Sequence, residues 1–337
     1  MPALREVGEV EAIRLITRGA AARDDVVVGP GDDAAVLRCG PGEDLVATTD
    51  AMVEGRHYLS SWLEPRGRGA RLAALNLSDI AAMAARPRWA LLSVGVRPEH
   101  DIDALLEFQA GLAAALAADG AVIAGGNLVA VRGDEWWSLT LLGSVARERA
   151  WRRAGARPGD LLALTGLPGR AAAGFLLAHE HADIAREPMW RPLLEAWLHP
   201  RARTAFAQAL AAAGVVSAAI DVSDGVAGDL AHLCAASHMG CDVEAWSLPE
   251  DSLIARAAGI IRRPVTPLRL GPSDDYELLL AVDPRGRAAA EQVARDTQTP
   301  LWFIGRFTPQ PGQLALVEVH GERTPLGRGF DHFTGAR

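Results

Sequence analysis

The sequence predicts a two-domain protein of the α/β (α+β) class. At 337 residues the chain is long for a single hydrophobic core. Short apolar runs typical of strands alternate with longer segments of helical periodicity in both halves. Residues 147–160 are rich in Arg, Gly and Pro, which is typical of a boundary between domains. We therefore predict a first domain over residues 1–148, with a mixed sheet and helices, and a second α/β domain over residues 149–337.

The first half begins with a predicted amphipathic helix at residues 6–20, where apolar side chains recur with helical spacing from Val7 to Ile16. The elements predicted after it are a segment at 24–28 that leads into a turn, strands at 34–37 and 44–50, a helix at 69–85, a strand at 89–96, a helix at 101–119, a short strand at 121–124 and a strand at 136–145. Pro87 and Gly120 mark the ends of the last two helices. This order, β-β-α-β-α-β-β, is typical of helices that cover one face of a sheet.

The second half shows the same kind of pattern but no repeat at the level of residues. Its predicted elements are strands at 161–165, 218–222, 241–244, 277–282 and 301–306 and helices at 171–177, 201–213 and 228–237. In both halves, apolar strands end in acidic turns before helices.

The composition argues against several classes of function. The net charge of −8 argues against nonspecific nucleic-acid binding, which needs a basic face. All 34 basic residues are arginine, so any phosphate chemistry must neutralise charge with metal ions and arginine. The chain lacks a P-loop, a Gly-x-Gly-x-x-Gly that opens a helix, a His-Glu-x-x-His and a Gly-x-Ser-x-Gly. Without lysine, it also cannot form the protein-kinase arrangement.

The cysteines and the absence of long apolar runs indicate a cytoplasmic protein with no membrane partner. Cys39, Cys234 and Cys241 are too few and too unevenly spaced for a disulfide framework or a zinc site. We expect Cys234 and Cys241 to be buried thiols, seven positions apart on one helix. The first residues lack the apolar core of a signal peptide, and every run of 18 residues is interrupted by charge.

Six short acidic segments are the most informative feature of the chain. They lie at residues 31–33, 48–50, 77–79, 221–225, 242–244 and 273–277. Most lie where an apolar run breaks into a turn, where the end of a strand can direct a carboxylate into a cleft. Oxygen ligands of this kind suit Mg²⁺, which often bridges carboxylates to substrate phosphates. Each segment alone also has a structural interpretation, as a turn with solvated aspartates or as a helix N-cap.

Two of these segments carry the stronger signals. Asp79 lies among apolar residues on the same helix face as Asn76, with no basic residue within four positions, and a carboxylate that faces a core needs a partner such as a metal ion. Residues 221–225, Asp-Val-Ser-Asp-Gly, place three oxygen-bearing side chains within four positions before a glycine. This is a compact loop for a hard ion without EF-hand spacing. Asp229, on the following helix, faces either this site or solvent.

Two further segments carry weaker signals. Gly125-Gly126-Asn127 resembles a loop through which backbone N–H groups approach phosphate, although a plain turn is the alternative. His57 follows Arg56, which is consistent with an anion site, whereas a surface or capping histidine is the alternative.

Five motifs together resemble one known family. Gly-Asp-Asp-Ala-Ala, Thr-Thr-Asp-x-x-Val-Glu-Gly-x-His, Asn-Leu-Ser-Asp-Ile-Ala-Ala-Met, Asp-Val-Ser-Asp-Gly and Asp-Asp-Tyr-Glu-Leu occur in the order found in thiamine-monophosphate kinases. That family belongs to the superfamily of aminoimidazole ribonucleotide synthetase and selenophosphate synthetase. The resemblance spans residues 25–333. It implies an N-terminal domain that pairs with its twin in a homodimer, and a C-terminal domain that completes a cleft for nucleotide and substrate.

The resemblance also implies roles for individual residues. The metal ligands of the family fall on Asp33, Thr48, Thr49, Asp50, Asp79, Asp221 and Asp224. Its nucleotide contacts fall on Gly126, Asn127, Arg153 and Ser223, and its substrate contacts on His57, Asp274 and Phe330. Among these residues, Asp79, Asp224 and Arg153 are expected to be catalytic.

The chain departs from the family pattern at three positions. Asn127 replaces the usual aspartate, so a carboxylate becomes a neutral amide that still offers a carbonyl oxygen. Asp274 replaces a glutamate, and Gly327 replaces an aromatic residue. These departures bear on the substrate and on the strength of one metal site.

The implied reaction is direct in-line transfer of a phosphoryl group from ATP to thiamine monophosphate, with Mg²⁺, to give thiamine diphosphate. The acceptor is a phosphate oxygen that is already ionised, so no general base is needed, and no obvious base accompanies the acidic segments. Two alternatives stay open. One is a related ATP-dependent enzyme with another phosphate, carboxamide or selenide acceptor, although no Cys or Lys lies near the N-terminus for selenophosphate synthesis. The other is a non-catalytic nucleotide-binding protein.

Overall fold

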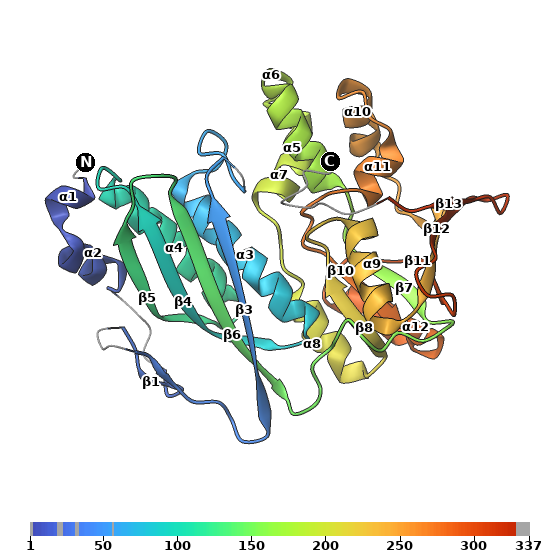
Figure 1. Cartoon of the computed structure of the whole chain (residues 1–337), viewed down its shortest axis with the longest axis horizontal. Coiled ribbons are helices and arrows are strands. Elements are labelled where there is room, and N and C mark those ends of the chain that lie inside the picture. The colour runs from blue at the N-terminus through green and yellow to red at the C-terminus, as the bar shows by residue number, and fades with distance from the viewer. Residues whose placement is uncertain (1–2, 19–22, 31–33, 56, 328–337) are drawn as a thin grey trace. The chain divides into compact units, whose positions relative to one another are not determined.

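The computed structural model describes residues 3–18, 23–30, 34–55 and 57–327. Its chain divides into two compact units, unit 1 from Met1–Ile80 and Ala85–Ala150, and unit 2 from Ala81–Ala84 and Trp151–Arg337 (Figure 1). Each unit contains its own sheet and helices, which confirms the predicted two-domain α/β class. In the described part of the chain, no helix is long and apolar enough to cross a membrane.

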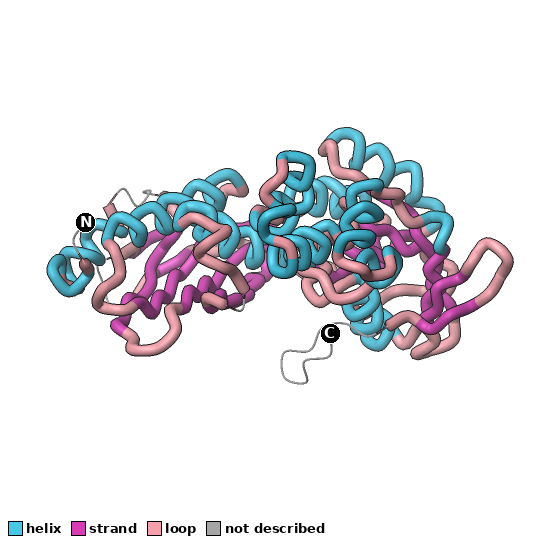
Figure 2. The backbone as a smooth tube through the Cα atoms, turned by 90° about the horizontal axis from the view of Figure 1, so that it is seen from above, coloured by secondary structure: helices cyan, strands magenta, loops and turns pink. Residues whose placement is uncertain are grey.

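Unit 1 is built on a mixed four-stranded sheet. Its strands are ordered β3 (Glu43–Val53), β6 (Trp136–Ala146), β4 (Arg86–Val96) and β5 (Val122–Ala130). Strand β6 runs antiparallel to both neighbours, whereas β4 and β5 are parallel and are joined through helix α4 (Ile102–Ala118). Helix α3 (Pro65–Ala82) joins β3 to β4. Figure 2 shows the helices on one face of this sheet, as the sequence predicts; we call the opposite face the open face.

Helices α3 and α4 approach each other closely because glycines lie at their contact. A Cβ atom on Gly69 of α3 would lie 2.0 Å from the carbonyl oxygen of Phe108, and one on Gly111 of α4 would lie 1.9 Å from that of Arg66. Beneath this contact, the ring of Phe108 stacks on Trp137 of β6 with 3.9 Å between ring centroids. Aromatic stacking and buried apolar area hold the helix layer to the sheet.

The N-terminal segment differs from the single predicted helix at 6–20. It forms α1 (Leu4–Val7) and α2 (Glu9–Ile16), separated at Gly8, whose φ of 81° and ψ of 156° are not helical. The end of the predicted helix lies outside the described residues. Strands β1 (Val26–Val28) and β2 (Val36–Leu37) then form an antiparallel pair. An ion pair between Asp25 and Arg88 of β4 holds this pair to the main sheet, and Arg23 pairs with the same carboxylate.

Unit 2 contains a seven-stranded sheet with helices on both faces. Its strands are ordered β13 (Arg323–Pro325), β12 (Leu314–Val317), β9 (Gly240–Glu244), β11 (Leu301–Thr308), β7 (Leu161–Thr165), β10 (Leu278–Val282) and β8 (Val216–Asp221). Among the described strands of this sheet, only β12 and β9 pair in parallel. Strands β7 and β10 are buried throughout because one set of their side chains faces a core with Leu230 and Leu233, and the other faces a core with Phe206 and Leu210.

The helices of unit 2 fill the connections between its strands. They are α5 (Arg170–Glu180), α6 (Ala182–Ala185), α7 (Arg191–Leu198), α8 (Thr204–Ala213), α9 (Val226–Ser237), α10 (Ser252–Ile260), α11 (Val265–Leu270) and α12 (Arg287–Asp296), with short 3₁₀ turns η1 (Pro188–Trp190), η2 (Ala245–Ser247) and η3 (Pro284–Gly286). The sequence predicted α5, α8 and α9 but not the other helices.

Two local predictions were wrong. Gly125, Gly126 and Asn127 do not form a loop, because β5 runs through them and pairs with β4. The absence of a side chain at Gly126 allows this pairing, since a Cβ there would lie 2.1 Å from the carbonyl oxygen of Leu92. Cys234 and Cys241 are buried as expected, but they lie on α9 and β9 and not on one helix.

Candidate functional site

Unit 1 brings three of the predicted metal ligands together at the edge strand β3. Side chains alternate between the two faces of a strand, so Thr48 and Asp50 share a face and Thr49 points the other way. Thr48 and Asp50 lie on the face that α3 covers, and Thr48 Oγ1 donates a hydrogen bond to Asp79 Oδ2 on α3 at 2.5 Å. A strand residue and a helix residue 31 positions apart in sequence therefore meet in one polar cluster.

The charge state of Asp50 reflects this setting. Burial and, to a smaller extent, the neighbouring negative charge of Asp79 together raise the pKa of Asp50 to about 7. No basic side chain of the described residues is among the groups that shift it. A bound cation would offset both the burial and the repulsion, which is the situation in which carboxylates bind a hard metal ion.

The neighbouring turns of α3 are buried in unit 1. Asn76 and Ser78 are fully buried, and Asn76 Nδ2 donates to the carbonyl oxygen of Leu72 at 2.9 Å. The sequence predicts that Asn76 and Asp79 share one helix face. In the structure, the amide of Asn76 lies in the core and the carboxylate of Asp79 lies against β3. Asn76 has a structural contact within its own helix.

Other predicted residues of unit 1 lie away from this cluster. The hydroxyl of Thr49 donates to the carbonyl oxygen of Leu139 and accepts from Thr140, both at 3.2 Å, on the open face. Gly126 and Asn127 lie on β5, which β6 and β4 separate from β3. Asn127 pairs with Ser93 in the row that continues to Ala51, so its side chain belongs to the open face and not to the face of Asp50. Metal or nucleotide roles for these residues stay predictions.

His57 occupies the turn after β3. Its Nδ1 accepts the backbone N–H of Val53 at 3.1 Å, which orients the ring from the end of the strand. Asp33 and Phe330, predicted for metal and substrate, lie outside the described residues.

Unit 2 carries the second acidic cluster on the loop between β8 and α9. Strand β8 ends at Asp221, which is buried, whereas Ser223 is exposed and Asp224 is half-buried. The carboxylate of Asp229, on the first turn of α9, accepts the backbone N–H groups of Ser223 and Asp224, both at 3.0 Å. The sequence left the orientation of Asp229 open, and the structure directs it toward this loop.

Arg153 acts electrostatically on the same loop. Burial raises the pKa of Asp229 to about 7 and the charge of Asp224 adds to the rise, while the two backbone N–H groups and the Arg153 guanidinium act against it. The exposed Arg153 side chain therefore lies near residues 221–229, and its role beside a phosphate stays a prediction. Within the described residues of either unit, no group of three His, Cys, Asp or Glu side chains could hold a metal ion alone. Mg²⁺, however, commonly uses one or two carboxylates with water and substrate phosphates.

The segment 273–277 lies directly beside the loop between β8 and α9. The backbone N–H of Tyr276 donates to the carbonyl oxygen of Val222, and the N–H of Val222 donates to that of Glu277, both at 2.8 Å. Tyr276 has a φ of 51°, a conformation that non-glycine residues seldom adopt. Asp274, predicted to contact substrate, is half-buried in this segment. Two acidic segments about 50 positions apart thus form one surface of unit 2.

The other acidic residues of that segment have structural partners. Asp275 accepts the backbone N–H groups of Gly169 at 2.8 Å and Ala171 at 3.2 Å, at the start of α5. Glu277 accepts from Thr165 Oγ1 at 2.6 Å and forms a two-point ion pair with Arg203. Sequence reasoning singled out the segment that contains Asp275 but missed Arg203 and Thr165, since no local pattern marks partners so distant in sequence.

The segment 242–244 is also structural. Asp242 forms a two-point ion pair with Arg323 of β13, and Glu244 accepts from Ser247 Oγ at 2.9 Å. Of the six acidic segments, this one has no feature of a ligand site.

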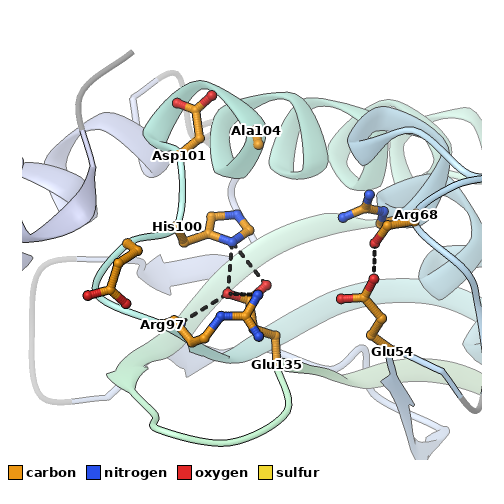
Figure 3. A pocket seen from close by; sticks show the side chains of 9 residues that line it. Glu54, Arg68, Arg97, His100, Asp101, Ala104 and Glu135 are labelled. Atoms are coloured by element: carbon orange, nitrogen blue, oxygen red, sulfur yellow. Dashed lines mark hydrogen bonds and ion pairs between the residues drawn. The ribbon is translucent and has the colours of Figure 1, made fainter.

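Unit 1 also contains a polar cavity of about 340 Å³ (Figure 3). Within it, Glu135 accepts from Arg97 N at 3.0 Å and lies 3.0 Å from His100 Nδ1. Its lining comprises Glu54, Ser60, Arg68, Arg97, Glu99, His100, Asp101, Ala104 and Glu135. None of the predicted site residues that the structure describes is part of this lining.

Comparison with known proteins identifies the family to which this fold belongs. The family model for the AIR synthase related protein N-terminal domain matches residues 31–145, and the model for the C-terminal domain matches residues 157–317. The fold and these two matches therefore define a two-domain AIR synthase related protein. A thiamine-monophosphate kinase of Salmonella typhimurium is 33% identical over 329 residues, which cover 97% of this chain and 98% of that protein. This chain belongs to the thiamine-monophosphate kinase family.

Solved structures agree with this placement. The crystal structure of thiamine-monophosphate kinase from Stenotrophomonas maltophilia K279a has a TM-score of 0.80 and 32% identity, covering 94% of this chain and 96% of that one. The structure of AaThiL complexed with AMPPCP and TMP has a TM-score of 0.74 and 26% identity, covering 99% of both chains. A hydrogenase maturation protein HypE, at 18% identity and a TM-score of 0.76, shares the fold.

Proposed function

We propose that this protein phosphorylates thiamine monophosphate with ATP to give thiamine diphosphate and ADP. The observation that carries the proposal is the full-length similarity to thiamine-monophosphate kinases, at 33% identity over 97% of the chain. The related AaThiL structure, whose complex holds AMPPCP and TMP, supports both an ATP-like ligand and TMP as ligands of this fold.

The residues present fit Mg²⁺ as the counter-charge. Two like unit charges about 4 Å apart repel by roughly 4 kcal/mol at an effective dielectric near 20, so joining two phosphates needs compensating positive charge. The chain has no lysine for this purpose. Asp50 and Asp79 in unit 1, and Asp221 and Asp224 in unit 2, would hold Mg²⁺. Bound Mg²⁺ would neutralise charge on the phosphates and on the in-line transition state.

The chain's own residues would bind and orient the reactants. Thr48 orients the Asp79 carboxylate through its hydrogen bond. Arg153 offers a planar set of donors to a phosphate. Ser223, exposed on its loop, would contact the nucleotide, and His57 and Asp274 would contact the substrate. No residue needs to remove a proton, because the acceptor oxygen is already ionised at neutral pH.

A product assay tests this proposal directly. The purified protein is incubated with ATP, Mg²⁺ and thiamine monophosphate, and ADP and thiamine diphosphate are quantified by chromatography. We expect the two products in equal amounts, no thiamine diphosphate when thiamine replaces the monophosphate, and no turnover with excess EDTA. ATP binding without turnover on thiamine monophosphate would contradict the proposal and favour a different acceptor or a non-catalytic role.

Alanine variants of Asp79 and Asp224 test the metal ligands. We expect each variant to fold and to lose turnover by at least a hundredfold, because each removes a charge that faces the phosphates. Near-normal rates in both folded variants would contradict the metal assignment. The proposed roles of the two predicted domains would then need revision. The first domain is proposed to bind ATP and Mg²⁺ and to dimerise, and the second to complete the cleft for nucleotide and substrate.

We also propose that the protein is a cytoplasmic homodimer that pairs through the open face of unit 1. This face carries Leu45, which is 58% exposed, and Val129, which is 41% exposed, and exposed apolar surface often marks an interface. The three unbridged cysteines are consistent with a reducing compartment. Light scattering should give the mass of a dimer for the native protein and of a monomer for Leu45→Arg, while Val10→Arg on α2 should stay dimeric. A native protein of monomer mass would contradict this proposal.

A further inference from the structure

Asp229 is a buried carboxylate for which the reaction proposed above has no use. It lies on the first turn of α9 and is 3% exposed. Its Oδ2 atom accepts two hydrogen bonds, from the backbone N–H groups of Ser223 and Asp224 at 3.0 Å each. Both donors lie in the loop that precedes the helix. One oxygen atom therefore holds two successive peptide groups.

The geometry of the loop depends on this contact. The preceding residue Val222 is fixed by backbone hydrogen bonds to Tyr276 and Glu277. The following residue Gly225 is enclosed, because a Cβ there would lie 2.0 Å from the carbonyl oxygen of Gly271. Between these two fixed points, the backbone N–H groups of Ser223 and Asp224 both turn inward to Asp229. Their side chains are left half-buried or exposed on the outer side of the loop.

A simple helix cap does not account for this arrangement. The N-cap position of α9 is Gly225, which has no side chain to cap the helix. A short polar residue at that position would usually satisfy the first turn at the surface. Asp229 instead places a carboxylate in the protein interior, where burying charge is costly. Its two hydrogen bonds go to the peptide groups of Ser223 and Asp224, and not to the N–H groups of the first helical turn.

We propose that Asp229 is a positioning residue that presents Asp224 and Ser223 to metal and nucleotide. Its carboxylate fixes the two peptide groups, and these fix the directions in which the Asp224 and Ser223 side chains leave the loop. Asp229 acts through hydrogen bonds as an acceptor and does not itself contact the metal. This inference rests on the proposed function of the loop, and it assigns a role to a residue outside the predicted ligand set.

Three variants at this position separate its possible roles. Asp229→Asn keeps an acceptor oxygen of the same size but removes the charge. Asp229→Ala and Asp229→Leu remove the acceptor, and leucine keeps a similar shape so that the test survives if the alanine variant fails to fold. Asp160→Ala is the matched control, because Asp160 is also buried in unit 2 and accepts from Arg157 N at 2.9 Å and Ser217 Oγ at 2.5 Å.

Mn²⁺ binding, followed by electron paramagnetic resonance in the full-length protein with AMPPCP, gives a readout that needs no turnover. We expect Asp229→Ala and Asp229→Leu to weaken Mn²⁺ binding and to raise the half-saturating Mg²⁺ concentration in the kinase assay by roughly tenfold, from two lost hydrogen bonds. Asp229→Asn should stay within about threefold of the native protein. Asp160→Ala should lower the melting temperature without changing metal binding.

Two outcomes would overturn the inference. Unchanged metal binding in both the alanine and leucine variants would show that Asp229 only stabilises α9. An asparagine variant as impaired as the alanine variant would show that the negative charge matters, as for a direct ligand. Failure of the proposed function appears differently, as a native protein that binds Mn²⁺ but forms no thiamine diphosphate.

Discussion

The hydroxyl of Thr48 donates a hydrogen bond to the carboxylate of Asp79, with 2.5 Å between Thr48 Oγ1 and Asp79 Oδ2. The bond joins β3 to α3 and fixes the Asp79 carboxylate beside Asp50, whose pKa it helps to raise through its charge. Hydrogen bonds to charged groups are among the stronger ones in proteins. The geometry of the acidic cluster in unit 1 therefore depends on a residue without charge.

Replacing Thr48 with valine should weaken the metal site. Valine keeps the branched shape but cannot donate to Asp79, so we expect the half-saturating Mg²⁺ concentration to rise by roughly threefold to tenfold. Thr48→Ser should restore most of the loss because it keeps the hydroxyl. Thr17→Val, which removes a hydroxyl bond to the carbonyl oxygen of Ile13 on α2, serves as a control for general effects on stability. Equal Mg²⁺ dependence in the valine and serine variants would refute this role.

Mg²⁺ binding should become tighter as the pH rises through 7. Burial and the charge of Asp79 raise the pKa of Asp50 to about 7 without metal, so below pH 7 the metal competes with a proton. We expect affinity to rise by up to tenfold per pH unit between pH 6 and 7 and to level off above pH 8. Calorimetry in buffers of different ionisation enthalpy should detect proton release on binding. If Asp50→Asn releases as many protons as the native protein, another group is responsible.

Asp275 should make the metal-free protein less stable at high pH. Burial raises its pKa in the folded state to about 7 from a usual value of 3.8, so the folded state holds a proton that the unfolded state has lost. The contribution of this group to the free energy of unfolding therefore falls as pH rises from about 4 to 7 and stays low above that.

Asp275→Asn removes this titration while keeping an acceptor for Gly169 and Ala171. The free energy of unfolding of the native protein, relative to that of the variant, should fall by about 1 kcal/mol or more between pH 5 and pH 8, since one pKa unit corresponds to about 1.4 kcal/mol. Urea denaturation at both pH values measures this difference. A constant difference would mean that Asp275 is ionised in the folded state throughout this range.

The ion pair between Arg203 and Glu277 should be costly to break from one side. Glu277 is 8% exposed, and Arg203→Ala would leave its carboxylate buried, with Thr165 as its remaining side-chain partner among the residues that the structure describes. We expect a loss of about 3 kcal/mol in the free energy of unfolding. The double variant Arg203→Met with Glu277→Gln should recover part of that loss, because it removes both charges. Additive losses in this double-mutant cycle would contradict a coupled pair.

Local signals in the sequence were sufficient for much of the fold. Strand β7 was predicted with the bounds that the structure shows, because an apolar run ends at Gly166. Helix α4 was predicted to within a residue at each end, because Asp101 caps its start and Gly120 follows its end. By contrast, Gly125 and Gly126 have the composition of a turn, and only pairing with a strand more than 30 positions away makes them part of β5.

In the candidate site too, neighbouring residues in the sequence predicted some features, whereas others depend on contacts between residues far apart in the sequence. Alternation along β3 predicts that Thr48 and Thr49 point to opposite faces, but not which face α3 covers. The acidic motifs drew attention to Asp79 and Asp224 because their own neighbours are unusual. The sequence marked Asp229 but left its orientation open, and it did not mark Arg203, since their contacts depend on the position of the backbone at residues 223–224 and of Glu277, which only tertiary structure supplies.

The backbone bonds that join Val222 to Tyr276 and Glu277 have a consequence for protein engineering and for divergence within the family. A chimera that took residues 221–225 from one relative and residues 273–277 from another would have to preserve two backbone hydrogen bonds and the left-handed conformation at Tyr276. If residues 273–277 contact the acceptor as proposed, changes of acceptor specificity there would be inherited together with the loop at residues 221–225. Recombination between relatives should succeed more often at crossover points outside residues 221–277 than at points within them.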